Sequence, residues 1–195
     1  ALEPLRLTNG PIIRSVTNLD GPPGIESQQD ADSAALQVIN IIKRNNSADA
    51  FVIACFSDPG IYAAREVTNK PVFGIAESGI LTALSLGSSF GILAILDTSV
   101  PRHVRYVRSL GLEKRLAGDL AIGLGVAELS DEKKTFHRLL EVGRKLRDNH
   151  EASVLILGCA GMARYRHNLQ ESLGIPVVDP SQAAVSMAVS AVLLN

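Results

Sequence analysis

Short runs of consecutive apolar residues recur along the chain and are separated by segments with helical periodicity. Within each run the apolar positions are continuous rather than alternating, as in strands that are covered on both faces of a parallel sheet. The predicted strands are Ile12–Val16, Ala50–Ala54, Val72–Ile75, Phe90–Leu96, Leu120–Val126, Val154–Leu157 and Val177–Val178.

Helical patterns fill the intervals between these runs. Apolar residues recur on one face from about Glu26 to Arg44 and again from Asp131 to Asp148, where Ser130 and an acidic first turn favour a helix start. A further helix is expected from about Pro101 to Leu110. Strands that alternate with helices indicate the α/β fold class with parallel sheets.

The pattern also contains an internal repeat. An apolar run, a cysteine, a helix-sized insert and a second apolar run beginning at Pro-Val occur once around Cys55 and again around Cys159, 104 positions later. We therefore predict two pseudosymmetric lobes, each a mostly parallel sheet flanked by helices, with the active site in the cleft between them. The lobes are expected to span residues 1–88 and 89–180, with a C-terminal helix, 181–195, packing back across both.

The repeat is incomplete at its beginning. Ile12–Val16 corresponds to Leu120–Val126, so the counterpart of Phe90–Leu96 is expected ahead of Ala1. The repeat thus predicts an additional N-terminal strand and most of a helix, with a polar loop near the site.

Composition narrows the class of partner. The chain has 19 basic and 20 acidic residues, no Trp, 3 Tyr and 5 Phe, which argues against a nucleic-acid partner. Its longest apolar stretches are near twelve residues, too short for a membrane span. No signal peptide is evident, and two cysteines do not form a secreted disulfide framework. A soluble cytoplasmic protein with a small-molecule substrate is expected.

The two cysteines are the candidate chemical groups. Each follows a predicted strand, and ligands of open α/β sheets gather at the carboxyl ends of strands. Asp58-Pro59 predicts a helix start just beyond Cys55, and Gly161 allows close backbone approach beyond Cys159. A helix N-terminus lowers a nearby cysteine pKa and can hold an anionic oxygen. The alternative is that both thiols fill a core.

Other chemistries are less well supported. The histidines show no ligand spacing relative to either cysteine, so no metal site is predicted; they are His103, His137, His150 and His167. No lysine lies at a predicted strand end, so a pyridoxal Schiff base is not indicated. Two thiols facing one cleft suit inversion of a carbon that bears an acidic proton, because one can act as base and the other as acid. Such a reaction needs no cofactor.

Three motifs carry a resemblance to a known family. Residues 54–60 (ACFSDPG), 74–77 (GIAE) and 158–162 (GCAGM) resemble the hydantoin and allantoin racemase branch of the aspartate/glutamate racemase superfamily. The resemblance implies two α/β lobes, cofactor-independent racemisation by Cys55 and Cys159, and a homo-oligomer. Ser57 departs from the family pattern, which usually has glycine there. The family's Asn-Pro-Asn loop would fall before Ala1.

The residues that follow the cysteines are small or apolar, which suits a neutral five-membered ring better than a zwitterion. Glu77 could contact a substrate nitrogen or simply begin a helix, and Thr98 and Ser99 could supply hydroxyl contacts or form a plain turn. The full set of predicted substrate-binding residues is Phe56, Ser57, Glu77, Thr98, Ser99, Ala160, Gly161 and Met162.

Several charged residues are expected to be structural. Asp58 and Asp179-Pro180 are interpreted as helix caps, and Arg102, Arg105 and Arg108 as a solvated helix face.

Three other functions stay open. The same scaffold could act as an aspartate or glutamate racemase, or as a decarboxylase or cis–trans isomerase. A small-molecule binding protein with inert thiols is the non-enzymatic alternative, and thiols reachable from a cleft would argue against it.

Overall fold

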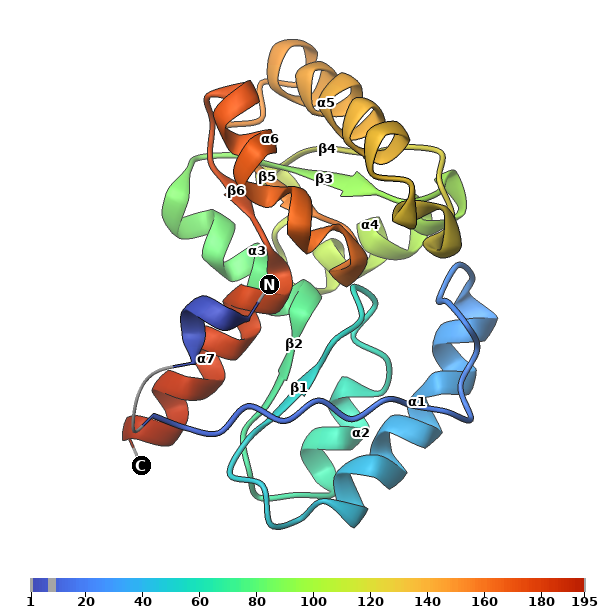
Figure 1. Ribbon diagram of the computed structural model, residues 1–195, viewed down its shortest axis with the longest axis vertical. Helices are drawn as coiled ribbons and strands as arrows, with labels where there is room; N and C mark the ends of the chain where they lie inside the picture. The colour runs from blue at the N-terminus through green and yellow to red at the C-terminus, as the bar shows by residue number, and fades with distance from the viewer. Residues whose placement is uncertain (1, 7–9, 195) are drawn as a thin grey trace.

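The computed structural model describes residues 2–6 and 10–194, which form two parallel sheets with helices around them (Figure 1). The larger sheet has the strand order β4-β3-β5-β6, and the smaller one pairs β1 with β2. The strands are β1 (Phe51–Ile53), β2 (Val72–Gly74), β3 (Phe90–Ala94), β4 (Leu116–Ala121), β5 (Val154–Leu157) and β6 (Val177–Val178). All of their pairings are parallel, so the predicted α/β class with helix-flanked parallel sheets is confirmed.

Helices connect successive strands. The α-helices are α1 (Gln28–Arg44), α2 (Ile61–Glu66), α3 (Ile75–Leu86), α4 (Val100–Ser109), α5 (Glu132–Asn149), α6 (Arg166–Leu173) and α7 (Pro180–Leu194). The short 3-10 segments are η1 (Glu3–Leu5), η2 (Asp97–Ser99), η3 (Glu113–Arg115), η4 (Val126–Ser130) and η5 (Ala160–Tyr165). No helix within residues 2–6 and 10–194 is both long and apolar enough to cross a membrane.

The larger sheet is covered on both faces, which explains its continuous apolar strands. Leu155 and Leu157 of β5 pack with α5 and α6, while Val154 and Ile156 of the same strand pack with α3 and α7. Alternate residues of a strand point to opposite faces, so a strand covered on both sides must be apolar at every position. All four residues of β5 are buried.

Helix α7 connects the two sheets. It packs along α3 and also contacts β1, β2 and η5 (Figure 1). Helix α3 in turn packs on β5, although it follows β2 in sequence. The C-terminal helix therefore packs against elements of both halves, while the limits of the two lobes stay a prediction.

Two predicted strands were wrong. Residues Ile12–Val16 form no strand, and Ile12 and Val16 are 80% and 59% exposed, so their apolar side chains join no core. The run Leu120–Val126 was placed too late, because β4 ends at Ala121 and the chain turns at Gly123, which has a φ of +73°. Ile122 and Leu124 lie in this loop, yet their side chains are buried. Their apolar run in the sequence therefore resembles that of a strand.

Candidate active site

A cavity of about 230 Å³ opens where the carboxyl ends of β1, β3 and β5 face one another. Its walls come from both halves of the chain, and both cysteines line it. The lining residues are Gly24, Ile25, Ala54, Cys55, Phe56, Ser57, Ile95, Ser99, Arg102, His103, Val126, Gly158, Cys159, Ala160 and Gly161. A cavity therefore lies at the strand ends where the sequence places the site, and the roles of its residues stay predictions.

The strands place the two cysteines. Cys55 lies two residues beyond β1, and the amide of Asp58 donates to its carbonyl at 2.9 Å, which closes a turn. Cys159 lies two residues beyond β5, and the amide of Gly158 donates to Leu93 O at 2.9 Å. A Cβ at Gly158 would come 2.5 Å from Leu93 O, so only glycine fits where the chain leaves the sheet.

Both thiols are free and half-buried, and they are reachable from the cavity. Burial raises the pKa of Cys55 to about 11, and the negative charge of Cys159 adds to the rise. Burial also raises the pKa of Cys159. Backbone N–H groups of Ser57, in the turn after Cys55, and of Gly161, in the first turn of η5, favour the respective thiolates. The expected lowering of the thiol pKa was nevertheless wrong, because desolvation outweighs these donors.

Asp58 is a cap, but of a more distant helix than expected. Its φ is +41°, and the helix that follows it, α2, begins after Gly60 instead. The buried carboxylate accepts the amides of Ala76 and Glu77, each at 2.9 Å, and thereby caps α3. Burial raises the pKa of Asp58 to about 6 against the effect of these donors. Asp58 thus joins the loop after Cys55 to the start of α3.

Gly74 makes this contact possible, because a Cβ there would overlap the Asp58 carboxylate. In the other half, Asp179 caps α7 locally, accepting the amide of Ser181 at 2.9 Å, as predicted from Asp179-Pro180.

Arg102 corrects the prediction of a solvated arginine face on α4. Arg105 and Arg108 are exposed, but Arg102 is only 9% exposed and lines the cavity. At about 100° per residue, positions 102 and 108 differ by about 120° around the helix, so they do not share one face. The Arg102 Nε donates to Ser57 Oγ at 3.0 Å.

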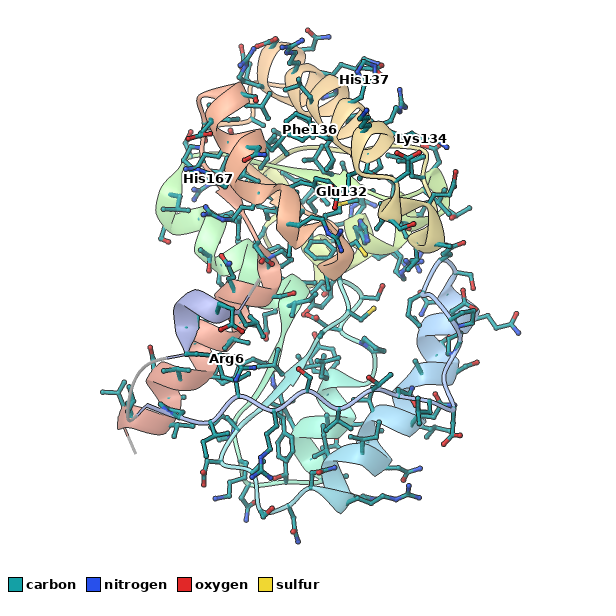
Figure 2. All side chains as sticks on the ribbon, in the orientation of Figure 1. Arg6, Glu132, Lys134, Phe136, His137 and His167 are labelled. Atoms are coloured by element: carbon teal, nitrogen blue, oxygen red, sulfur yellow. The ribbon has the colours of Figure 1, made fainter. Side chains whose placement is uncertain are left out.

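A buried histidine–carboxylate pair lies beside Arg102. His103 Nδ1 is 2.9 Å from Asp119 Oδ2, and both side chains are almost fully buried. The His103 ring packs edge-on against Phe56, with centroids 5.1 Å apart. Burial raises the pKa of Asp119, and the neighbouring His103 opposes the rise. His137 and His167, by contrast, lie on the outer helices α5 and α6 (Figure 2).

Five predicted substrate-binding residues line the cavity together with the cysteines; they are Phe56, Ser57, Ser99, Ala160 and Gly161. Three others lie outside the lining. Met162 is buried in the core beneath β5, Glu77 pairs with Arg65, and the Thr98 hydroxyl donates to Glu26 O at 3.1 Å. The Thr98 contact ties η2 to the segment before α1.

Sequence reasoning did not assign Arg102, His103, Ile25 or Val126 to the cavity. The first two could have been found, because the start of α4 follows β3 and therefore lies at the same sheet edge as the cysteines. Ile25 and Val126 carry no comparable signal. Among the described parts of the chain, 2–6 and 10–194, no three His, Cys, Asp or Glu side chains are grouped to hold a metal ion.

Comparison with known proteins gives the family. The Asp/Glu/Hydantoin racemase family model matches residues 1–188. A hydantoin racemase from Paenarthrobacter aurescens is 36% identical over 194 residues, which cover 97% of this chain and 82% of that protein.

Solved structures agree with this assignment. An allantoin racemase from Pseudomonas fluorescens has a TM-score of 0.90 at 30% identity, covering 94% of this chain and 79% of that one. An allantoin racemase from Klebsiella pneumoniae has a TM-score of 0.82 at 34% identity, covering 89% and 72%. The protein is a racemase, and the chain belongs to the Asp/Glu/Hydantoin racemase family, in its hydantoin and allantoin racemase branch.

Proposed function

We propose that this protein inverts the C5 stereocentre of a hydantoin-like ring with Cys55 and Cys159 as the two acid–base groups. The observation that carries the proposal is that both cysteines, at corresponding strand ends of two sheets, line one cavity. The hydantoin and allantoin racemases among the similar proteins support the choice of ring.

The reaction moves one proton on each side of the ring. The thiolate of one cysteine takes the C5 proton, so the C–H bond breaks, an S–H bond forms and the electron pair spreads onto the adjacent carbonyl oxygen. The thiol of the other cysteine then delivers a proton to the opposite face of C5. The enzyme ends with the thiolate and thiol exchanged, and the reverse reaction restores them.

The cavity lining suits this substrate class. Most of its residues are apolar or small, including Ile25, Ile95, Val126 and Ala160, and such walls favour a neutral ring over a zwitterion. Independence from a cofactor, a cytoplasmic location and a homo-oligomeric assembly remain predictions from the sequence.

Racemisation can be tested with enantiopure substrates in deuterated water. The protein would be incubated separately with hydantoins substituted at C5, allantoin, aspartate and glutamate, while optical rotation and deuterium at the stereocentre are followed. We expect loss of rotation together with deuterium incorporation for hydantoins or allantoin. Racemisation of the amino acids alone, or no exchange with any substrate, would contradict the proposed function.

A further inference from the structure

Arg102 is a buried cation whose hydrogen-bonding capacity is mostly unused. Within residues 2–6 and 10–194, its one hydrogen bond runs from Nε to Ser57 Oγ, and no carboxylate forms an ion pair with it. Burial lowers the pKa of Arg102, and Cys55, Asp30 and Asp119 oppose this shift only through charge interactions at longer range. A guanidinium has five N–H donors, so the two terminal NH₂ groups have no partner among the described residues, and Arg102 lines the cavity that holds the cysteines. Burying such a group is costly unless a ligand or partner engages it.

A second polar group in the same wall is also without a partner. The Ser99 side-chain oxygen is buried and makes no hydrogen bond with the described part of the chain. Ser99 immediately precedes α4 and Arg102 lies in the first turn of that helix, so both come from one short, rigid segment. Both residues line the cavity that holds the two thiols. The wall of this cavity thus contains two side chains, Arg102 and Ser99, whose hydrogen-bond donors have unused capacity.

Ser57 gives the arginine a fixed direction. A hydrogen bond at Nε holds the guanidinium plane, so the terminal groups are presented as a fork. Only the segment after Cys55 supplies a hydroxyl of this kind, because the position equivalent to Ser57 in the segment after Cys159 is Gly161.

We propose that Arg102, oriented by Ser57 and assisted by the Ser99 hydroxyl, binds the carbonyl oxygen next to the substrate stereocentre and stabilises the negative charge that develops there. The role deepens the proposed racemase function and rests on it. When the thiolate removes the C5 proton, the electron pair moves onto this oxygen. A preorganised cation stabilises that charge more than it stabilises the neutral substrate, so it accelerates the reaction.

Kinetics of three variants test this role. Arg102→Met should lower kcat by about 10²–10³-fold with a much smaller change in KM, as expected when a transition-state donor is lost. Arg102→Lys should be intermediate, because an ammonium keeps the charge but not the fork. Arg108→Met is the matched control on the same helix, since Arg108 is exposed and pairs with Glu113, and its kcat should be unchanged. Circular dichroism and thermal unfolding would establish that each variant is folded.

Binding of a planar anion provides a readout besides activity. Urazole is a five-membered dicarbonyl ring that is anionic at neutral pH, and its affinity would be measured by calorimetry. We expect Arg102→Met to weaken urazole binding by at least about tenfold, whereas Arg108→Met leaves it unchanged.

The outcomes separate this proposal from the proposed function. Unchanged kcat in Arg102→Met, or urazole affinity independent of Arg102, would overturn the role of Arg102 while leaving racemisation intact. If the wild-type protein racemises neither the hydantoins nor allantoin, the proposed function fails, and urazole binding alone then decides whether Arg102 is the anion-binding group of this cavity.

Discussion

Cys55 and Cys159 follow corresponding strands, yet the sheets to which those strands belong differ. β5 lies inside a four-stranded sheet with β3 on one side and β6 on the other, and all its residues are buried. β1 pairs with β2 alone within the described residues, and two of its three residues are only partly buried. The repeat therefore preserves a turn at each cysteine, closed by the amide of Asp58 to Cys55 O at 2.9 Å and by that of Met162 to Cys159 O at 3.1 Å, without preserving the surroundings of the strand.

The immediate neighbours of the two thiols differ as well. On the Cys55 side the cavity carries Ser57, Arg102 and His103, and the buried carboxylate of Asp58 lies three residues along the chain. On the Cys159 side the following residues are Ala160 and Gly161. Two corresponding strand ends can thus bring both thiols to one cavity, while the side chains make one wall polar and the other apolar.

The largest expected effect comes from removing either thiol. If each thiol serves one face of the ring, Cys55→Ser and Cys159→Ser should each lower racemisation by at least about 10³-fold, because general acid–base groups contribute factors of this size. Each variant keeps one thiolate and should still exchange the C5 proton of one enantiomer. Proton NMR in deuterated water measures this exchange for both enantiomers. Full racemisation by either variant would show that its cysteine is not a required base.

The pH dependence should be nearly as large and can compare the two thiols directly. A raised pKa keeps a thiol protonated at neutral pH, so the thiolate population rises about tenfold per pH unit until the pKa is approached. We expect kcat/KM to increase steeply above pH 7. Exchange by Cys159→Ser, which retains Cys55, should keep increasing well above pH 8 and level off somewhat below pH 11, because the Cys159 charge that adds to the raised pKa of Cys55 is absent in this variant. The same profile for Cys55→Ser reports on Cys159. A plateau below pH 8 in either variant would contradict burial as the dominant influence on that thiol.

The two aspartate caps should differ in their effect on stability. The Asp58 carboxylate accepts two amides and the Tyr106 hydroxyl, whereas Asp179 accepts the amide of Ser181 at 2.9 Å and that of Gln182 at 3.4 Å. We expect the free energy of unfolding to fall by about 2–4 kcal/mol in Asp58→Ala, and by about 1–2 kcal/mol in Asp179→Ala. Urea denaturation measures both. Equal losses of unfolding free energy would mean that Asp58, which caps the distant helix α3, stabilises the fold no more than Asp179, which caps the helix directly after it.

The sequence predicted the buried strands of the larger sheet because they are covered on both faces. The runs at β3, β5 and β6 are continuous for that reason, whereas β1 and β2 are continuous although some of their residues are only partly buried. The cysteines were located by their place beyond β1 and β5. The same signal failed where apolar residues are exposed, at Ile12, or buried from a loop, at Ile122.

The polar wall of the site was harder to predict, because it depends on contacts between distant segments. Periodicity within α4 does not indicate that Arg102 faces Ser57, 45 positions earlier in the chain. Asp58 was recognised as a cap, but its partners lie 18 and 19 positions away, across β2. Local patterns thus predicted the framework and the thiols, and tertiary contacts determined what surrounds them.

The smallest expected effect tests the apolar wall. A methyl group in Gly161→Ala would lie 3.6 Å from the Cys159 sulfur and 3.2 Å from Leu129 Cδ1, so it reduces the space beside one thiol without reaching the other wall. We expect kcat/KM to fall by less than about tenfold, because a single methyl in a pocket changes binding by about 1 kcal/mol. The two enantiomers have equal free energy, so kcat/KM must fall equally in both directions. The asymmetry should instead appear in kcat and KM taken separately, with the larger change for the enantiomer that approaches Cys159. Progress curves started from each pure enantiomer measure these constants, and equal changes in both would mean that the two walls contribute alike.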